Sequence, residues 1–122
     1  MNTHDALADA AIFIASRRRG ASLNGRDEEE SLWRYLRALS DFVHVTGQVY
    51  RFEDSLQKTV PTERPPVSAR LITHPGKFAQ LAVELLLKAL NETPEPEQKQ
   101  NVLVLLALLN FIADSGQLNA VE

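Results

Sequence analysis

Three consecutive arginines, Arg17 to Arg19, are the first residues along the chain whose type and spacing could do chemistry. Guanidinium groups bind carboxylates and phosphates, so Arg17, Arg18 and Arg19 are a candidate anion-binding set. The run also closes a stretch, 5–18, in which apolar side chains recur at the spacing of one helix face. Cations near the end of a helix complement its dipole. We therefore expect Gly20 to end that helix. The preferred interpretation of the arginines is that they stabilise the C-terminal end of this helix, and anion binding is the second interpretation.

Four consecutive carboxylates, from Asp27 to Glu30, are the next candidates. Metal ligands and paired catalytic carboxylates have to converge on one point, whereas consecutive side chains of a helix fan out around it. Acidic residues at a helix N-terminus complement its partial positive charge. We therefore expect this cluster to open a helix rather than to bind a metal.

The three histidines, His4, His44 and His74, share no spacing typical of metal ligands. Asp41 and His44 stand three residues apart, which resembles one half of the carboxylate-x-x-His motif of di-iron helical bundles. Those proteins carry a second copy of the motif and two further glutamates, and this sequence has no second copy. We expect neither a metal nor another cofactor.

A second partial resemblance involves His74, which begins the stretch His-Pro-Gly-Lys. It resembles the H-x-x-K part of the phosphoacceptor motif of histidine phosphotransfer domains, which are four-helix bundles of about this size. The family has a small residue after the lysine and places its histidine within a helix. Here Phe78 follows Lys77, and Pro75 would place His74 at a helix start. The resemblance implies an alternative function in which His74 accepts a phosphoryl group.

Other catalytic patterns do not occur in the sequence. It has no cysteine, which excludes a thiol nucleophile and a thiolate zinc site. No phosphate-binding glycine motif, HExxH motif or G-x-S-x-G elbow is found. We expect no catalytic residues and therefore no enzyme.

The candidate protein-binding residues lie on the segment 32–56. Its apolar side chains follow a heptad spacing and form one broad stripe, and Trp33 falls outside that stripe, near arginines. An exposed tryptophan beside arginines is typical of an interface hot spot. The predicted partner-binding residues are Trp33, Arg34, Arg37, His44 and Arg51. The alternative is that the segment 58–74 folds over Trp33 and buries it.

Helices have to position all these residues. The 122 residues include 18 Leu and 14 Ala against 9 Val and 4 Ile, which favours helix over strand. We expect one all-α domain over 1–122, a four-helix bundle with a long second helix and an apolar C-terminal helical hairpin. The expected helices cover about 5–18, 27–57, 75–91 and 94–114, and the segment 58–74 is irregular because of its prolines. Gly47 lies inside the second helix, and two helices broken there are the alternative.

The last two expected helices are apolar on most sides, and no charged residue lies between Lys99 and Asp114. A chain of this size has difficulty covering two such helices, so we expect a homodimer or a complex with a protein partner. The end of the chain, 117–122, has the pattern of another helix that is not completed. On that ground the sequence is expected to be part of a longer protein.

The charge balance, the longest apolar run and the first twenty residues bear on nucleic-acid binding, membrane association and cellular location. A net charge of −3 argues against nucleic acid as a partner, and an arginine-mediated nucleic-acid-binding regulator is kept as an alternative. The run 102–109 is shorter than the roughly 20 residues that cross a bilayer, so no membrane association is expected. The first twenty residues lack the layout of a secretory signal, which predicts a cytoplasmic protein.

These observations predict a function mainly by exclusion. The leading hypothesis is a small non-enzymatic protein-protein interaction module, such as an adaptor, an immunity or inhibitor protein, or a regulatory subunit. The phosphotransfer domain and the nucleic-acid-binding regulator are the alternatives.

Overall fold

The computed structural model describes residues 3–58, 67–68, 71, 77–93 and 95–121, and every regular element among them is a helix. The helices are α1 (Thr3–Leu23), α2 (Asp27–Val45), α3 (Val49–Lys58), α5 (Lys77–Glu92), α6 (Pro96–Asp114) and α7 (Leu118–Val121). The all-α class is therefore confirmed. None of the described helices is both long enough and apolar enough to cross a membrane.

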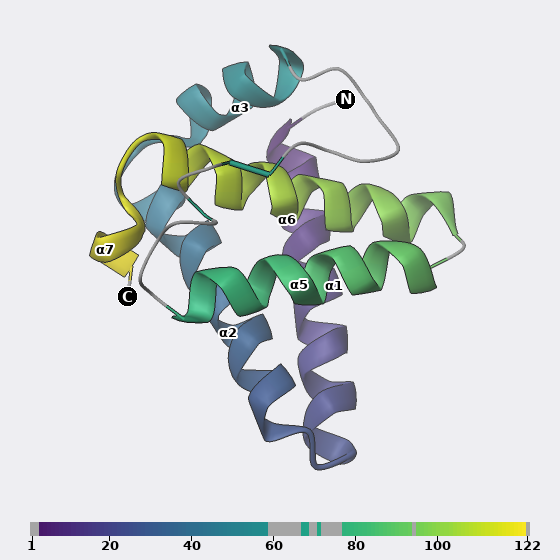
Figure 1. Cartoon of the computed structure of the whole chain (residues 1–122). Coiled ribbons are helices and arrows are strands. Elements are labelled where there is room, and N and C mark those ends of the chain that lie inside the picture. Colours follow the sequence, from purple (N-terminus) through teal and green to yellow (C-terminus); the bar gives the residue numbers. More distant parts are fainter. Residues whose placement is uncertain (1–2, 59–66, 69–70, 72–76, 94, 122) are drawn as a thin grey trace.

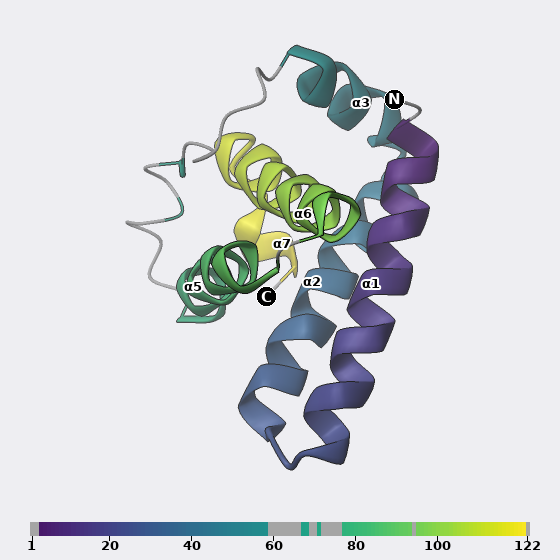
Figure 2. The same cartoon turned by 90° about the vertical axis from the view of Figure 1, so that its right-hand side faces the viewer.

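Two helix pairs form two crossed layers. α1 and α2 pack against each other as one hairpin, and α5 and α6 lie side by side (Figure 1). The α5–α6 pair crosses the hairpin rather than running along it, and α3 covers α6 at the end where α1 begins (Figure 2). A four-helix bundle in particular is not confirmed by this crossed arrangement.

The long second helix was wrongly predicted, and the alternative of a break at Gly47 is correct. α2 ends at Val45 and α3 begins at Val49. Gly47 has a φ of +68°, a conformation that glycine adopts without the penalty that a Cβ would add. The backbone N–H groups of Gly47 and Gln48 bond to carbonyls of His44 and Val43, at 3.2 and 2.9 Å. The last carbonyls of α2 are thus satisfied within the turn.

The first helix is longer than expected, because Gly20 does not end it. α1 continues to Leu23, and Gly25, with a φ of +70°, is the glycine of the following turn. The N–H of Arg26 bonds to the carbonyl of Ala21 at 2.8 Å. The last turn of α1 consequently contains no basic residue, so the three arginines are not the dipole-compensating end of this helix.

Proline positions set the start of α6. Pro96 is in the first turn of the helix and Glu95 is its N-cap residue, so the helix starts two residues later than expected. The start predicted for the preceding helix, at residue 75, and most of the irregular segment 58–74 lie outside the described residues.

Four carboxylates, Asp27 to Glu30, occupy the first turn of α2 as predicted.

The core is centred on α6. Eight of its side chains are buried, and α1, α2, α3 and α5 all pack against it. The apolar side chains of this helix are therefore buried or half-buried within the same chain. α5 keeps a polar outer strip that includes Gln80, Glu84, Lys88 and Asn91, all exposed.

Candidate protein-interaction surface

Trp33 belongs to the core and not to a binding surface. Its side chain is 1% exposed, and its ring meets Phe13 of α1 edge-on, with centroids 5.7 Å apart. The indole N–H has no hydrogen-bond partner among the described residues. The expectation that Trp33 is exposed is wrong, because the stripe that α2 buries is wide enough to include this position.

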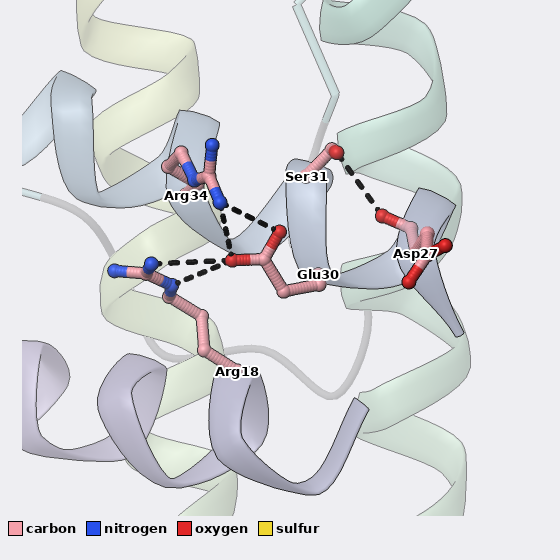
Figure 3. A network of polar contacts seen from close by, with 5 residues as sticks. All are labelled: Arg18, Asp27, Glu30, Ser31 and Arg34. Carbon is pink, nitrogen blue, oxygen red and sulfur yellow. Dashed lines mark hydrogen bonds and ion pairs between the residues drawn. The ribbon is translucent and has the colours of Figure 1, made fainter. Parts of the chain in front are cut away.

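Arg34 is engaged in a network that joins α1 to α2 (Figure 3). It donates to both carboxylate oxygens of Glu30, at 2.9 and 3.0 Å, one turn earlier on the same helix. Arg18 of α1 donates to the same carboxylate at 3.2 Å. The hydrogen bond from Arg34 and then that from Arg18 lower the pKa of Glu30 below its ordinary value, while partial desolvation opposes them.

The three consecutive arginines point in different directions. Arg17 donates to the hydroxyl of Thr93 at 3.3 Å and lies over the ring of Phe13, 5.0 Å from its centroid. Arg18 is held by Glu30. Arg19 is exposed, and the described part of the chain offers it no hydrogen bond or ion pair. The predicted anion-binding set is therefore dispersed, and among the described residues only Arg18 of the three has a carboxylate partner.

A surface hollow of about 260 Å³ lies beside Arg19. Ala15, Arg18, Arg19 and Ser22 of α1 line it, together with Glu30 of α2. The four α1 residues are spaced i, i+3, i+4 and i+7, which is the outline of a hole between side chains on one helix face. The hollow is mixed in charge, since Arg18, Arg19 and Glu30 all line it.

The remaining predicted partner-binding residues separate onto different helices. Arg37 is exposed on α2 and donates to Asp41 at 3.1 Å. His44, also exposed on α2, places Nδ1 2.8 Å from the carbonyl oxygen of Ser40. Arg51 lies on α3 and faces the ring of Phe111 on α6, at 6.0 Å. Arg51 thus belongs to the contact between α3 and α6.

Two exposed side chains that the sequence reasoning missed flank the turn between α2 and α3. Val45 is 85% exposed and Tyr50 is 84% exposed. A continuous helix over 27–57 would place Tyr50 within the apolar stripe, but the break at Gly47 changes which side of the following helix faces the core. Recognition of Gly47 as a helix end would have predicted the exposure of Tyr50.

No metal site is assembled in the described part of the chain. It contains no group of three His, Asp or Glu residues able to hold an ion. Asp41 and His44 instead have the separate partners given above. His74 lies outside the described residues.

Comparison with protein-family models, with curated proteins and with solved structures finds no match to this chain.

Proposed function

We propose that this chain is a small non-enzymatic protein-interaction module, of the adaptor, inhibitor or regulatory-subunit kind. The surface that binds the partner is the α2–α3 corner, which we define as Arg37, His44, Val45 and Tyr50. The single observation that carries the proposal is the high exposure of Val45 and Tyr50 on either side of one turn.

The chemistry of the α2–α3 corner supports a protein partner. Tyrosine and arginine are enriched at interfaces, since each combines apolar area with hydrogen-bonding capacity. Burying the exposed Val45 and Tyr50 side chains against a partner would remove apolar surface from water. His44, next to Val45, and Arg37, about two turns earlier on α2, would supply the polar rim.

The turn that carries the corner is held in one conformation, which supports preorganised binding. Gln48 is buried within the turn and the N–H of Phe52 bonds to its carbonyl at 3.0 Å. Phe52 itself is fully buried and packs against Phe111. A surface that is already ordered loses less conformational entropy on binding than a flexible loop does.

The experiment is affinity capture from an extract of the source cells, with the bound proteins quantified by mass spectrometry. The variant Val45→Ser/Tyr50→Ser removes the apolar corner without touching a buried residue. The matched control is Glu84→Ser/Lys88→Ser on the exposed strip of α5. We expect the double corner variant to lose a partner that the wild type and the control retain. Equal capture by all three proteins, or the absence of any specific partner, contradicts the proposal.

We further propose that α1, α2, α5 and α6 act as one four-helix domain rather than two independent hairpins. The support for this is that the buried side chains of both layers form one cluster. Unfolding should then be a single cooperative transition, followed by circular dichroism and by Trp33 fluorescence in the same urea titration. Two separated transitions would contradict it.

A further inference from the structure

Only three residues, 46–48, join the α1–α2 hairpin to the rest of the chain. Gly47, at the centre of this turn, has a φ of +68°, so the backbone leaves the helical direction there. α3 consequently lies over α6 instead of extending α2 (Figure 2). We call residues 46–48 the hinge turn, since they connect a half made of α1 and α2 to a half made of α3, α5, α6 and α7.

The apolar residues before and after the hinge turn keep the spacing of one uninterrupted helix. Tyr35 and Phe42 of α2 and Val49 and Leu56 of α3 follow one another at intervals of seven residues. All four are half-buried and pack against the same core cluster. Side chains seven residues apart lie on nearly the same face of a helix. The sequence on both sides of the hinge turn is therefore compatible with one continuous amphipathic helix, although Gly47 breaks that helix in the folded monomer.

The two halves meet through contacts that two chains can make as well as one. α1 and α2 hold each other through Phe13 and Trp33, whose ring centroids are 5.7 Å apart, and this contact stays intact when the hairpin moves as a unit. Tyr35 of α2 instead stacks on Phe78 of α5, with centroids 5.9 Å apart, and the buried side chains of both halves form one cluster. A second copy of the chain can supply either side of these contacts, because it carries the same two surfaces.

We propose that the hinge turn allows two copies of this chain to swap their α1–α2 hairpins. In the swapped dimer α2 and α3 of each copy form one continuous helix, and the α1–α2 hairpin of each copy packs against α5 and α6 of the other. The second copy is thus seated on a face that α1 and α2 already cover in the monomer. The inference goes beyond the proposed function, because it does not depend on the α2–α3 corner.

The free energies of monomer and dimer differ mainly through the hinge turn, because the contacts between the two halves are the same in both. In the monomer the N–H of Gln48 bonds to the carbonyl of Val43 at 2.9 Å and closes the end of α2. In the dimer the last carbonyls of α2 accept from the first N–H groups of α3, groups that have no partner within a helix when the helices are separate. Glycine is a poor residue inside that continuous helix, which favours the monomer. Association also costs entropy, so the dimer requires a high protein concentration.

Swapping requires the hairpin to leave the core, since Leu36, Leu39 and Val43 of α2 are fully buried. Folded monomers should therefore exchange very slowly, and the dimer should form when the chain refolds at high concentration. The experiment equilibrates the chain in partially denaturing urea at low and at high protein concentration and then removes the urea. Sedimentation velocity measures monomer and dimer, and circular dichroism confirms that each variant is folded.

Gly47→Ala tests the hinge turn. Alanine is disfavoured at the positive φ of the monomer and favoured in the helix of the dimer, and the dimer contains two such positions. We expect the ratio of dimer to monomer at high concentration to rise by about tenfold or more relative to the wild type. In dilute solution the variant should remain a monomer. The matched control Gly20→Ala makes the same change inside α1, away from the hinge turn, and should leave the ratio unchanged. If Gly47→Ala refolds only to a monomer, or forms no more dimer than Gly20→Ala, the proposal is overturned.

A cross-link shows whether the dimer is swapped. The chain has no cysteine, so Gly47→Ala/Tyr35→Cys and Gly47→Ala/Phe78→Cys each carry a single thiol. When the two variants are mixed before refolding, a short bifunctional maleimide should link the thiol at position 35 of one copy to the thiol at position 78 of the other. The same two variants, folded separately as monomers and then mixed, should not be linked. A dimer that forms without this link associates through another surface, and that result also overturns the proposal.

Discussion

Gln48 and Gln117 exchange two hydrogen bonds of 2.9 Å, each carboxamide donating to the oxygen of the other. The pair joins the turn between α2 and α3 to the turn between α6 and α7, across 69 residues of sequence. Gln48 is buried, so its carboxamide has to be satisfied within the protein. This pair therefore holds the α2–α3 turn against the α6–α7 turn.

The first prediction follows from that pairing. Gln117→Ala deprives the Gln48 oxygen of its donor, and we expect the free energy of unfolding to fall by about 1–2 kcal/mol. The control Asn91→Ala removes an exposed carboxamide from α5 and should change it by less than about 0.5 kcal/mol. Urea unfolding measures both. The double variant Gln48→Leu/Gln117→Leu should recover part of the loss, since it leaves no unpaired carboxamide. A larger loss in the double variant than in Gln117→Ala would contradict this account.

The second prediction concerns Trp33, the one tryptophan of the chain. Trp33→Ala should destabilise the fold by about 3–5 kcal/mol, because it leaves a cavity against Phe13. Trp33→Phe keeps an aromatic ring in the same place and removes an indole N–H that lacks a described partner. It should therefore cost markedly less than the alanine variant. The measurement is thermal or urea unfolding, and equal losses for the two variants would contradict the packing argument.

The same residue shows how far the sequence could predict the site. Leucine and alanine content, together with apolar spacing, was sufficient for the helical class and for the approximate positions of α1, α5 and α6. Whether Trp33 is buried depends on how much of the surface of α2 is covered by α1. That covered area is a property of the packing of the two helices and cannot be derived from the sequence of α2 alone. The direction of Arg17 was unpredictable for a similar reason, because its partner Thr93 lies 76 residues away.

The second limit on prediction from the sequence was the direction in which the residues after Gly47 face around their helix. Residues up to Val45 were placed correctly on one helix, but a single glycine at position 47 changed which side of the following helix faces the core. Tyr50 thereby moved from the expected apolar stripe to the surface. The pattern of apolar residues could be fitted to either arrangement, and only tertiary contacts distinguish them.

The third prediction is a pH dependence that originates at Glu30. The pKa of this carboxyl is lowered in the folded state from an ordinary value of 4.5, so its ionised form stabilises the fold at neutral pH. That contribution is fully present above the ordinary pKa and is lost as the pH falls through the lowered value of the folded state. Unfolding midpoints in urea should therefore fall between about pH 5 and pH 3.

A comparison of two glutamine variants assigns that pH dependence. Glu30→Gln should have a smaller fall in its midpoint over this range than the wild type, because the group no longer titrates. Glu84→Gln, on the exposed strip of α5, should keep the slope of the wild type. If both variants retain that slope, the Arg18–Glu30–Arg34 network does not contribute to acid sensitivity.

The fourth prediction compares two glycines that the sequence analysis treated alike, as helix ends or breaks. Gly20 lies within α1, and a Cβ added there would meet no atom within 4 Å. Gly20→Ala should stabilise the fold by about 0.5–1 kcal/mol, because alanine has the higher helix propensity. Gly47 also has open space around it, but its φ of +68° disfavours any residue with a Cβ. Gly47→Ala should destabilise by about 1–2 kcal/mol.

The two substitutions should change the free energy of unfolding in opposite directions. The chemical change is the same in both variants and neither introduces a clash, so the difference reports the backbone conformation. Urea unfolding gives the two free energies. If Gly47→Ala were neutral or stabilising, the turn would tolerate a helical conformation and α2 could continue into α3. Tyr50 would then return to the apolar side of one long helix, and the exposed corner on which the proposed function depends would be lost.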